Sequence, residues 1–277
     1  MSTLTAAPAR SSADAVLVKV EPVTPARALR SEWIKMRSLR SSALTLAAGV
    51  VTMVGAGWII GGVTNAYWST LRPEELASFS AIDRTLVGYN LAQLAVGVLG
   101  VLLVTGEYAT GMIRATFATV PQRLPVLWAK AALYAGVTFA LMLAAAFAAF
   151  RGGQRLLGTH GTDLSATGAM QAVFGVAGYL TLIGVFAVAL GFIIRSTAGG
   201  IATLFGLLLV LPGIGLLLPA GWQHHVLPYL PSNAGASMIN THSATGSLSA
   251  TTSLLVLLGW VAAALVGAAL LVKRRDA

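Results

Sequence analysis

Residues 171–194 read QAVFGVAGYLTLIGVFAVALGFII and residues 198–218 read AGGIATLFGLLLVLPGIGLLL, with only Arg195-Ser196-Thr197 between them. Neither run contains a charged residue. A helix needs about 20 residues to cross the apolar core of a bilayer, so each run is long enough for one crossing. The pair therefore predicts two consecutive membrane-spanning helices joined by a tight turn, the second kinked at Pro212.

Four further windows meet the same test, and Lys130 is the only charged residue in all six; these windows are 43–62, 86–105, 126–150 and 251–272. The 277-residue chain is 56% hydrophobic and 10% charged, whereas a soluble domain is nearer a quarter charged. The sequence predicts an all-α integral membrane protein with six transmembrane helices. Residues 1–24 are expected to form a disordered tail, 25–41 an amphipathic helix, and 42–277 the six-span domain, which leaves no room for a soluble catalytic domain.

The distribution of charge predicts the orientation of the chain. If the N-terminus is cytoplasmic, 14 of the 18 basic residues and five of the nine acidic ones lie on that side. The outer side then carries no net charge, and the cytoplasmic side carries all of the +9. This asymmetry is the positive-inside pattern, so both chain ends are expected in the cytoplasm. The basic charge is explained by membrane lipids and topology, and a nucleic-acid partner is not expected.

Two short amphipathic helices are predicted on the cytoplasmic side. After Thr24-Pro25, a typical helix start, Leu29, Trp33 and Met36 share one face of a basic helix that suits the membrane surface. That helix could also do no more than anchor the first span. Between spans two and three, Ile113, Phe117 and Val120 share a face, and Pro121 ends the helix.

Isolated polar and small residues inside the spans give weaker signals. Asn90 and Gln93 share one face of the second span, and either could line a pathway or hydrogen-bond to another helix. Lys130 lies about one turn into the third span and is expected to reach the inner interface as an anchor. The Gly57-x-x-x-Gly61 pattern suits close helix packing but is also frequent by chance. Part of the last outer loop, 219–250, is expected to pack into the outer membrane interface.

No pattern of catalytic or metal-binding residues is found in the sequence. The chain has no cysteine, which removes disulfides and thiolate sites. Gly106-x-x-x-x-Gly111 fails as a phosphate-binding loop because Met112 and Ile113 follow it instead of Lys and Ser/Thr. The adjacent His224 and His225 are poorly spaced for one metal ion. We therefore expect neither an enzyme nor a cofactor-binding chain.

Three segments together resemble permeases of ABC transporters of the second export type, especially actinobacterial ones. The first is Leu29-Arg30-Ser31-Glu32-Trp33-x-Lys35-x-Arg37-Ser38. The second is Gly106-Glu107-Tyr108-x-Thr110-Gly111-x-Ile113-Arg114-Ala115-Thr116, followed by Val120-Pro121-x-Arg123 and Lys130. The third is Leu230-Pro231-Ser232-Asn233-Ala234-Gly235. The resemblance covers nearly all of the chain after residue 25, and the second segment is the most specific.

The resemblance implies a permease subunit of an ATP-driven exporter in a bacterial cytoplasmic membrane. ATP and magnesium would bind a separate ATP-hydrolysing subunit, and two permease copies, identical or not, would pair. The residues implied to couple the chain to that subunit come from the connecting helix and the coupling helix: Glu32, Trp33, Lys35, Glu107, Tyr108, Ile113, Arg114 and Phe117. Glu107 and Arg114 would position the coupling helix, although Glu107 could equally cap a local turn. The substrate is expected to be hydrophobic or amphipathic.

Two other functions remain open from the sequence. An ion-coupled secondary transporter usually carries acidic or histidine residues at mid-membrane, and none of the six windows contains one. A non-transporting scaffold or assembly factor is compatible with six apolar spans, but the second amphipathic helix has no obvious purpose in it.

Overall fold

A computed structural model describes residues 24–38, 40–119, 123–241 and 247–274, and within these ranges it is helical without any strand. Six helical segments are long and apolar enough to cross a membrane, which confirms the all-α membrane architecture. They are α2 (Arg40–Ala66), α4 and α5 (Ala81–Leu86 and Tyr89–Ala109), α7 (Leu124–Leu157), α8 (Ala169–Ile194), the α9–α10 segment (Thr197–Gly215) and α13 (Ala250–Arg274). The predicted tail lies almost entirely outside the described residues.

The shorter helices lie at the two ends of the bundle and in the last loop. They are α1 (Pro25–Ser38), η2 (Trp68–Thr70), α3 (Pro73–Ala77), α6 (Met112–Thr119), η3 (Gly158–His160), α11 (Ala220–His225), η5 (Leu227–Tyr229) and α12 (Pro231–Ile239). Both predicted amphipathic helices are therefore present as α1 and α6. Val120 and Pro121, which were expected to end the second of them, lie outside the described residues.

Helix α8 forms the centre of the bundle. It packs against α5, α7 and α13, and 72% of its most apolar window is buried inside the protein. Its continuous apolar sequence fits this position because protein surrounds most of its circumference. Helix α2, by contrast, has 17% of the corresponding window buried, so most of its surface is not covered by the rest of the chain.

Small residues allow α2 to pack closely on α4 and α7. A Cβ atom added to Gly61 would lie 2.7 Å from the backbone oxygen of Gly153, and one added to Gly57 would lie 2.2 Å from the backbone oxygen of Thr85. Contacts this short leave no room for a side chain. The interpretation of Gly57-x-x-x-Gly61 as a packing face is thus confirmed.

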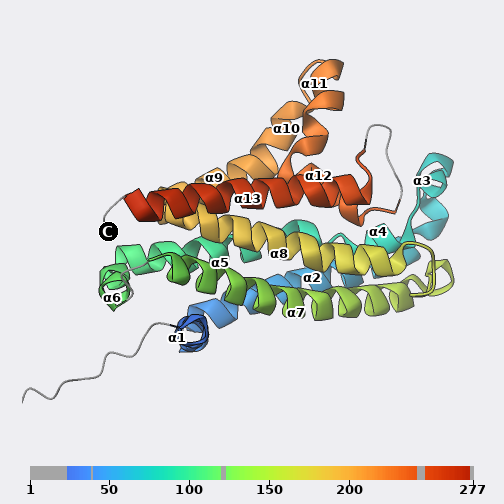
Figure 1. Ribbon diagram of the computed structural model, residues 1–277. Helices are drawn as coiled ribbons and strands as arrows, with labels where there is room; N and C mark the ends of the chain where they lie inside the picture. The colour runs from blue at the N-terminus through green and yellow to red at the C-terminus, as the bar shows by residue number, and fades with distance from the viewer. Residues whose placement is uncertain (1–23, 39, 120–122, 242–246, 275–277) are drawn as a thin grey trace, which may run out of the picture.

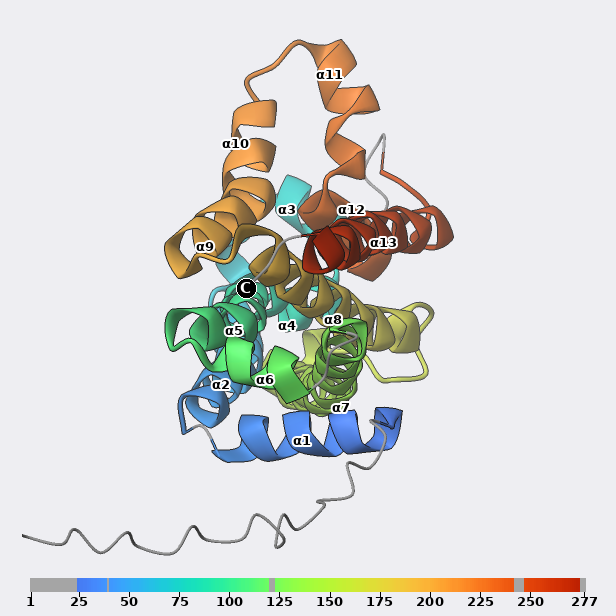
Figure 2. The same ribbon diagram turned by 60° about the vertical axis from the view of Figure 1, so that its left-hand side comes forward.

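The fifth span is interrupted next to Pro212, as the sequence predicts. Between α9 (Thr197–Phe205) and α10 (Leu211–Gly215), residues Gly206–Val210 form a π-helical turn. Proline has no backbone N–H, and its ring displaces the carbonyl four residues earlier, at Leu208, so regular helix cannot continue there. Beyond this point α10 and α11 project away from the bundle, and the chain returns through α12, which packs on α8 and α13 (Figure 2).

Helices α1 and α6 lie at the same end of the bundle as the last turn of α13 (Figure 1). We call this end, with the Ile194–Thr197 turn, the basic end. Arg123 at the start of α7 donates a hydrogen bond to the backbone oxygen of Val272 over 3.5 Å. The Arg195 guanidinium lies 5.1 Å from the centre of the Tyr108 ring. These contacts tie α7 to α13 and α5 to α8 at this end.

Candidate functional site

Helix α1 lies across the bundle at the basic end, beneath α2 and α7 (Figure 2). Its start matches the prediction, because Thr24 Oγ1 accepts from the Arg27 amide at 3.4 Å and Pro25 is the first helical residue. Its apolar stripe is not buried as a unit, since Met36 is 8% exposed but Trp33 is 44% exposed. Apolar packing against the rest of the chain therefore holds α1 only weakly.

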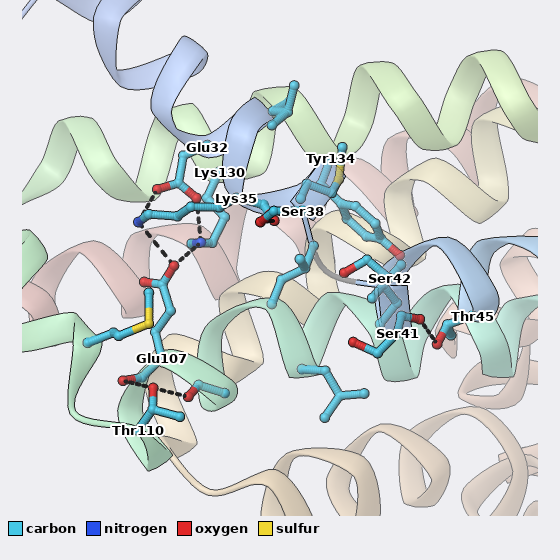
Figure 3. Close-up of a pocket in the computed structure, with 17 residues that line it drawn as sticks. Glu32, Lys35, Ser38, Ser41, Ser42, Thr45, Glu107, Thr110, Lys130 and Tyr134 are labelled. Atoms are coloured by element: carbon cyan, nitrogen blue, oxygen red, sulfur yellow. Dashed lines mark hydrogen bonds and ion pairs between the residues drawn. The ribbon is translucent and has the colours of Figure 1, made fainter.

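Four charged side chains from α1, α5 and α7 meet at this end of the bundle (Figure 3). We call them the ion-pair quartet: Glu32, Lys35, Glu107 and Lys130. Lys130 Nζ donates to Glu32 Oε2 and, over 2.9 Å, to Glu107 Oε1. Lys35 Nζ donates to Glu32 Oε1 over 2.9 Å and to Glu107 Oε1 over 3.1 Å. The quartet joins α1 to α5 and α7, through pairs that are 72 and 98 residues apart in the sequence.

The expectation that Lys130 reaches the membrane interface as an anchor is wrong. Its side chain is 4% exposed, and its ammonium group faces two carboxylates inside the protein. A lysine extends to the interface when water is the best available partner for its charge. Here Glu32 and Glu107 supply that partner without leaving the protein interior.

The quartet carries no net charge when all four groups are ionised. Burial disfavours the charge on Glu32, but the ion pairs with Lys130 and Lys35 outweigh it and lower the pKa of Glu32 below its ordinary value. Burial likewise opposes the charge on Lys35, but its bonds to Glu32 and Glu107 raise the pKa of Lys35. Both groups of α1 therefore stay ionised over a wide pH range.

Glu107 binds other helices rather than capping its own turn. Helix α5 continues to Ala109, so Glu107 lies in the last turn of the second span and not in α6. Local capping falls to Thr110, whose hydroxyl donates to the Gly106 backbone oxygen over 2.9 Å. Gly111, with φ of 72°, then provides the left-handed conformation that redirects the chain into α6.

Helix α6 is seated by the two apolar residues that the sequence predicted. Ile113 is 2% exposed and Phe117 is 8% exposed. Arg114, expected to help position this helix, is exposed. The ammonium of Lys35 reaches Thr116 Oγ1 over 3.4 Å and so connects α1 to α6.

The two polar residues near the start of α5 have different environments. Gln93 is buried, donates to the backbone oxygen of Asn90 over 3.0 Å and accepts a hydrogen bond from the Tyr179 hydroxyl on α8. Asn90 is exposed. Of the two interpretations left open by the sequence, the interhelical hydrogen bond holds for Gln93. Both residues are more than ten positions from Glu107 on the same helix and do not belong to the quartet.

A cavity of about 530 Å³ adjoins the quartet (Figure 3). All four members of the quartet line it. Its other walls come from hydroxyl side chains at the start of α2 and from leucines on α5 and α7, including Ser41, Ser42, Thr45, Leu99, Leu102, Leu103 and Leu133. One end is therefore polar and charged, and the walls are mainly apolar.

No cluster of three or more metal-ligating residues occurs in the ranges that the structure covers. No protein-family model matches the chain, and no curated protein matches its sequence.

Proposed function

We propose that the chain is the membrane-spanning permease subunit of an ATP-driven ABC exporter, with a separate ATP-binding subunit and a second permease copy as partners. The observation that carries this proposal is the ion-pair quartet. It links α1, which has little apolar burial, to the ends of two spans, and Lys35 extends the link to α6. The first two of the three segments that resemble this class of permease contain all four residues of the quartet.

The quartet suits the transmission of motion from the basic end into the bundle. Ion pairs hold α1, α5 and α7 in a defined arrangement, so a displacement of α1 or α6 must either move the spans or break charge pairs. Packed helices move as rigid bodies in such transitions. By the positive-inside rule the basic end is cytoplasmic, in a bacterial plasma membrane, and this is the side where ATP is available.

The first experiment asks whether an ATPase binds at α6. The tagged chain is purified from its native membranes, and co-purifying ATP hydrolysis is measured. Phe117→Ala is expected to reduce the hydrolysis recovered, because it removes the larger of the two side chains that seat α6. Phe139→Ala is the matched control, since Phe139 is 38% exposed on the lipid-facing surface of α7. Recovery of no ATPase with the wild-type chain would contradict the proposal.

An ion-coupled secondary transporter is the second candidate, and one observation favours it. Glu107 and Lys130 are buried ionisable residues within spans, a common feature of ion pathways. Efflux of lipophilic dyes from cells that express the chain separates the two functions. Export that stops on ATP depletion and survives an uncoupler supports the ABC proposal, whereas the reverse pattern supports ion coupling. Absence of export from untreated cells favours the scaffold.

A further inference from the structure

The cavity beside the quartet has the features of a small-molecule site. Its volume of about 530 Å³ lies within the range of about 300–1,000 Å³ that is usual for ligand pockets. Ser38, Ser41, Thr110 and Met112 line it and are exposed, so they form its mouth at the basic end. Leu99 and Tyr134 are buried and form its floor. A ligand can therefore enter from the surface and reach apolar walls.

Glu107 lines this cavity, and one of its carboxylate oxygens has no hydrogen-bond donor among the described residues. Its Oε1 atom accepts from Lys35 and Lys130, but its Oε2 atom is buried and has no partner among the described residues. The residue is 8% exposed. A buried carboxylate oxygen without a donor costs free energy of about 1–3 kcal/mol or more, so an N–H or O–H donor placed beside it is stabilised.

The charges around Glu107 select the kind of donor. The quartet is neutral, and the same carboxylate already faces two ammonium groups. A cationic ligand head would be repelled by both ammoniums, while an anionic head would be repelled by the carboxylates. A neutral hydroxyl donates its proton to Oε2 without either penalty. The leucine walls require that the rest of the ligand be apolar.

We propose that this cavity binds a neutral amphiphile whose apolar chain lies against the leucines of α5 and α7. Its hydroxyl group donates a hydrogen bond to Glu107 Oε2 after a shift of the side chains that cover this oxygen. This goes beyond the proposed function, because binding by the chain alone requires neither ATP nor a partner subunit. Failure of the binding test and failure of the ATPase test are therefore separate results.

Photoaffinity labelling tests the site directly. The full chain in lipid nanodiscs is irradiated with decanol that carries a diazirine on its alkyl chain, and labelled residues are mapped by mass spectrometry. Label is expected on Leu99, Leu102, Leu103 or Leu133. Unlabelled decanol is expected to compete about ten-fold better than decyl methyl ether, which has no donor, and better than decylammonium.

Two variants define the controls. Leu102→Trp fills the cavity and is expected to remove the label from its walls, whereas Leu91→Trp alters an exposed position on the same helix and leaves the label unchanged. Glu107→Gln places an amide there and is expected to abolish the preference for alcohol over ether. Its helical content is checked by circular dichroism, and the Leu102→Trp result stands whether or not Glu107→Gln folds.

Three results would overturn the inference. Label confined to lipid-facing residues, or unaffected by Leu102→Trp, would show that the cavity binds no alkyl chain. Equal competition by the alcohol and the ether would remove the role of Glu107 Oε2. Stronger competition by decylammonium would replace the neutral head with a cationic one.

Discussion

Replacing Lys130 with methionine tests whether the quartet holds α1 in place. The substitution keeps a long apolar stem but removes the one ammonium that is buried between Glu32 and Glu107. The quartet then changes from neutral to a net charge of −1, with two carboxylates sharing the ammonium of Lys35. We expect α1 to separate from the bundle in a substantial fraction of molecules.

The size of the effect follows from the burial of the charges. Removing one partner of a buried ion pair costs about 3–5 kcal/mol, because the other charge is left uncompensated. The side chains of Lys130, Glu32 and Glu107 are 4%, 6% and 10% exposed, so they fall in this buried class. Lys35 remains and is 24% exposed, which places the expected loss near the lower limit. About 3 kcal/mol shifts the docking equilibrium roughly a hundred-fold.

The natural absence of cysteine makes the measurement simple. Cysteines are introduced at Ser31 on α1 and Leu141 on α7, both exposed, and carry spin labels for distance measurement by double electron–electron resonance in nanodiscs. The wild-type chain should give one distance population. Lys130→Met should add a second, longer one. Lys273→Met, at an exposed lysine of the same end, should leave the distribution unchanged.

A charge-balanced double variant sharpens the test. Glu32→Gln combined with Lys130→Met leaves the Glu107–Lys35 pair, and the site is neutral again. We expect it to dock α1 better than Lys130→Met alone, although one more charged group has been removed. Two results would refute the argument that charge compensation positions α1. One is a single, unchanged distance for Lys130→Met. The other is a double variant in which the fraction of molecules at the longer distance is at least as large as in Lys130→Met alone.

Two further outcomes follow from the same structure. The pKa of Glu32 is lowered from 4.5, so its contribution to docking is present above pH 4.5 and is lost as pH falls through the lowered value. The pKa of Lys35 is raised from 10.5, so its contribution is present below pH 10.5 and is lost as pH rises through the raised value. The spin-label distance should therefore stay constant between these limits. Gly61→Ala should lower stability by about 1–3 kcal/mol in thermal unfolding, since its Cβ meets the backbone of Gly153. Gly62→Ala, with nothing within 4 Å, should be neutral or stabilising, and equal effects at the two positions would contradict the packing argument.

The spans could be predicted from the sequence because their signal is local. A run of about 20 uncharged residues crosses a bilayer whatever its neighbours are, and all six windows correspond to helices. The ends of the spans were less accurate. The third window stopped at residue 150 because Arg151 follows, but α7 continues to Leu157. There the exposed Arg151 does not interrupt the helix, and the buried Gln154 donates to the backbone oxygen of Ala81.

The quartet could not be predicted from local sequence, because its geometry is tertiary. Glu32 and Lys130 are 98 residues apart, and Lys35 and Glu107 are 72 apart. Seen alone, a lysine one turn into a span has only water and headgroups as partners, and the anchor interpretation follows. The available signal was that Glu32 and Glu107 both lie on the side of the membrane where Lys130 enters its span.

Stability alone does not explain a buried quartet, because well-packed apolar side chains of similar size often stabilise a protein as much or more. Its advantage for α1 is directional: four ion pairs define one position of a helix that has little apolar burial, and charge pairs can exchange partners when that helix moves. Glu107 belongs both to the quartet and to the wall of the cavity. A ligand bound to its free oxygen would therefore favour one position of α1 over another only to the extent that its affinity differs between them. If the proposed function holds, occupancy of the cavity and the position of α1 are thermodynamically linked through this one carboxylate.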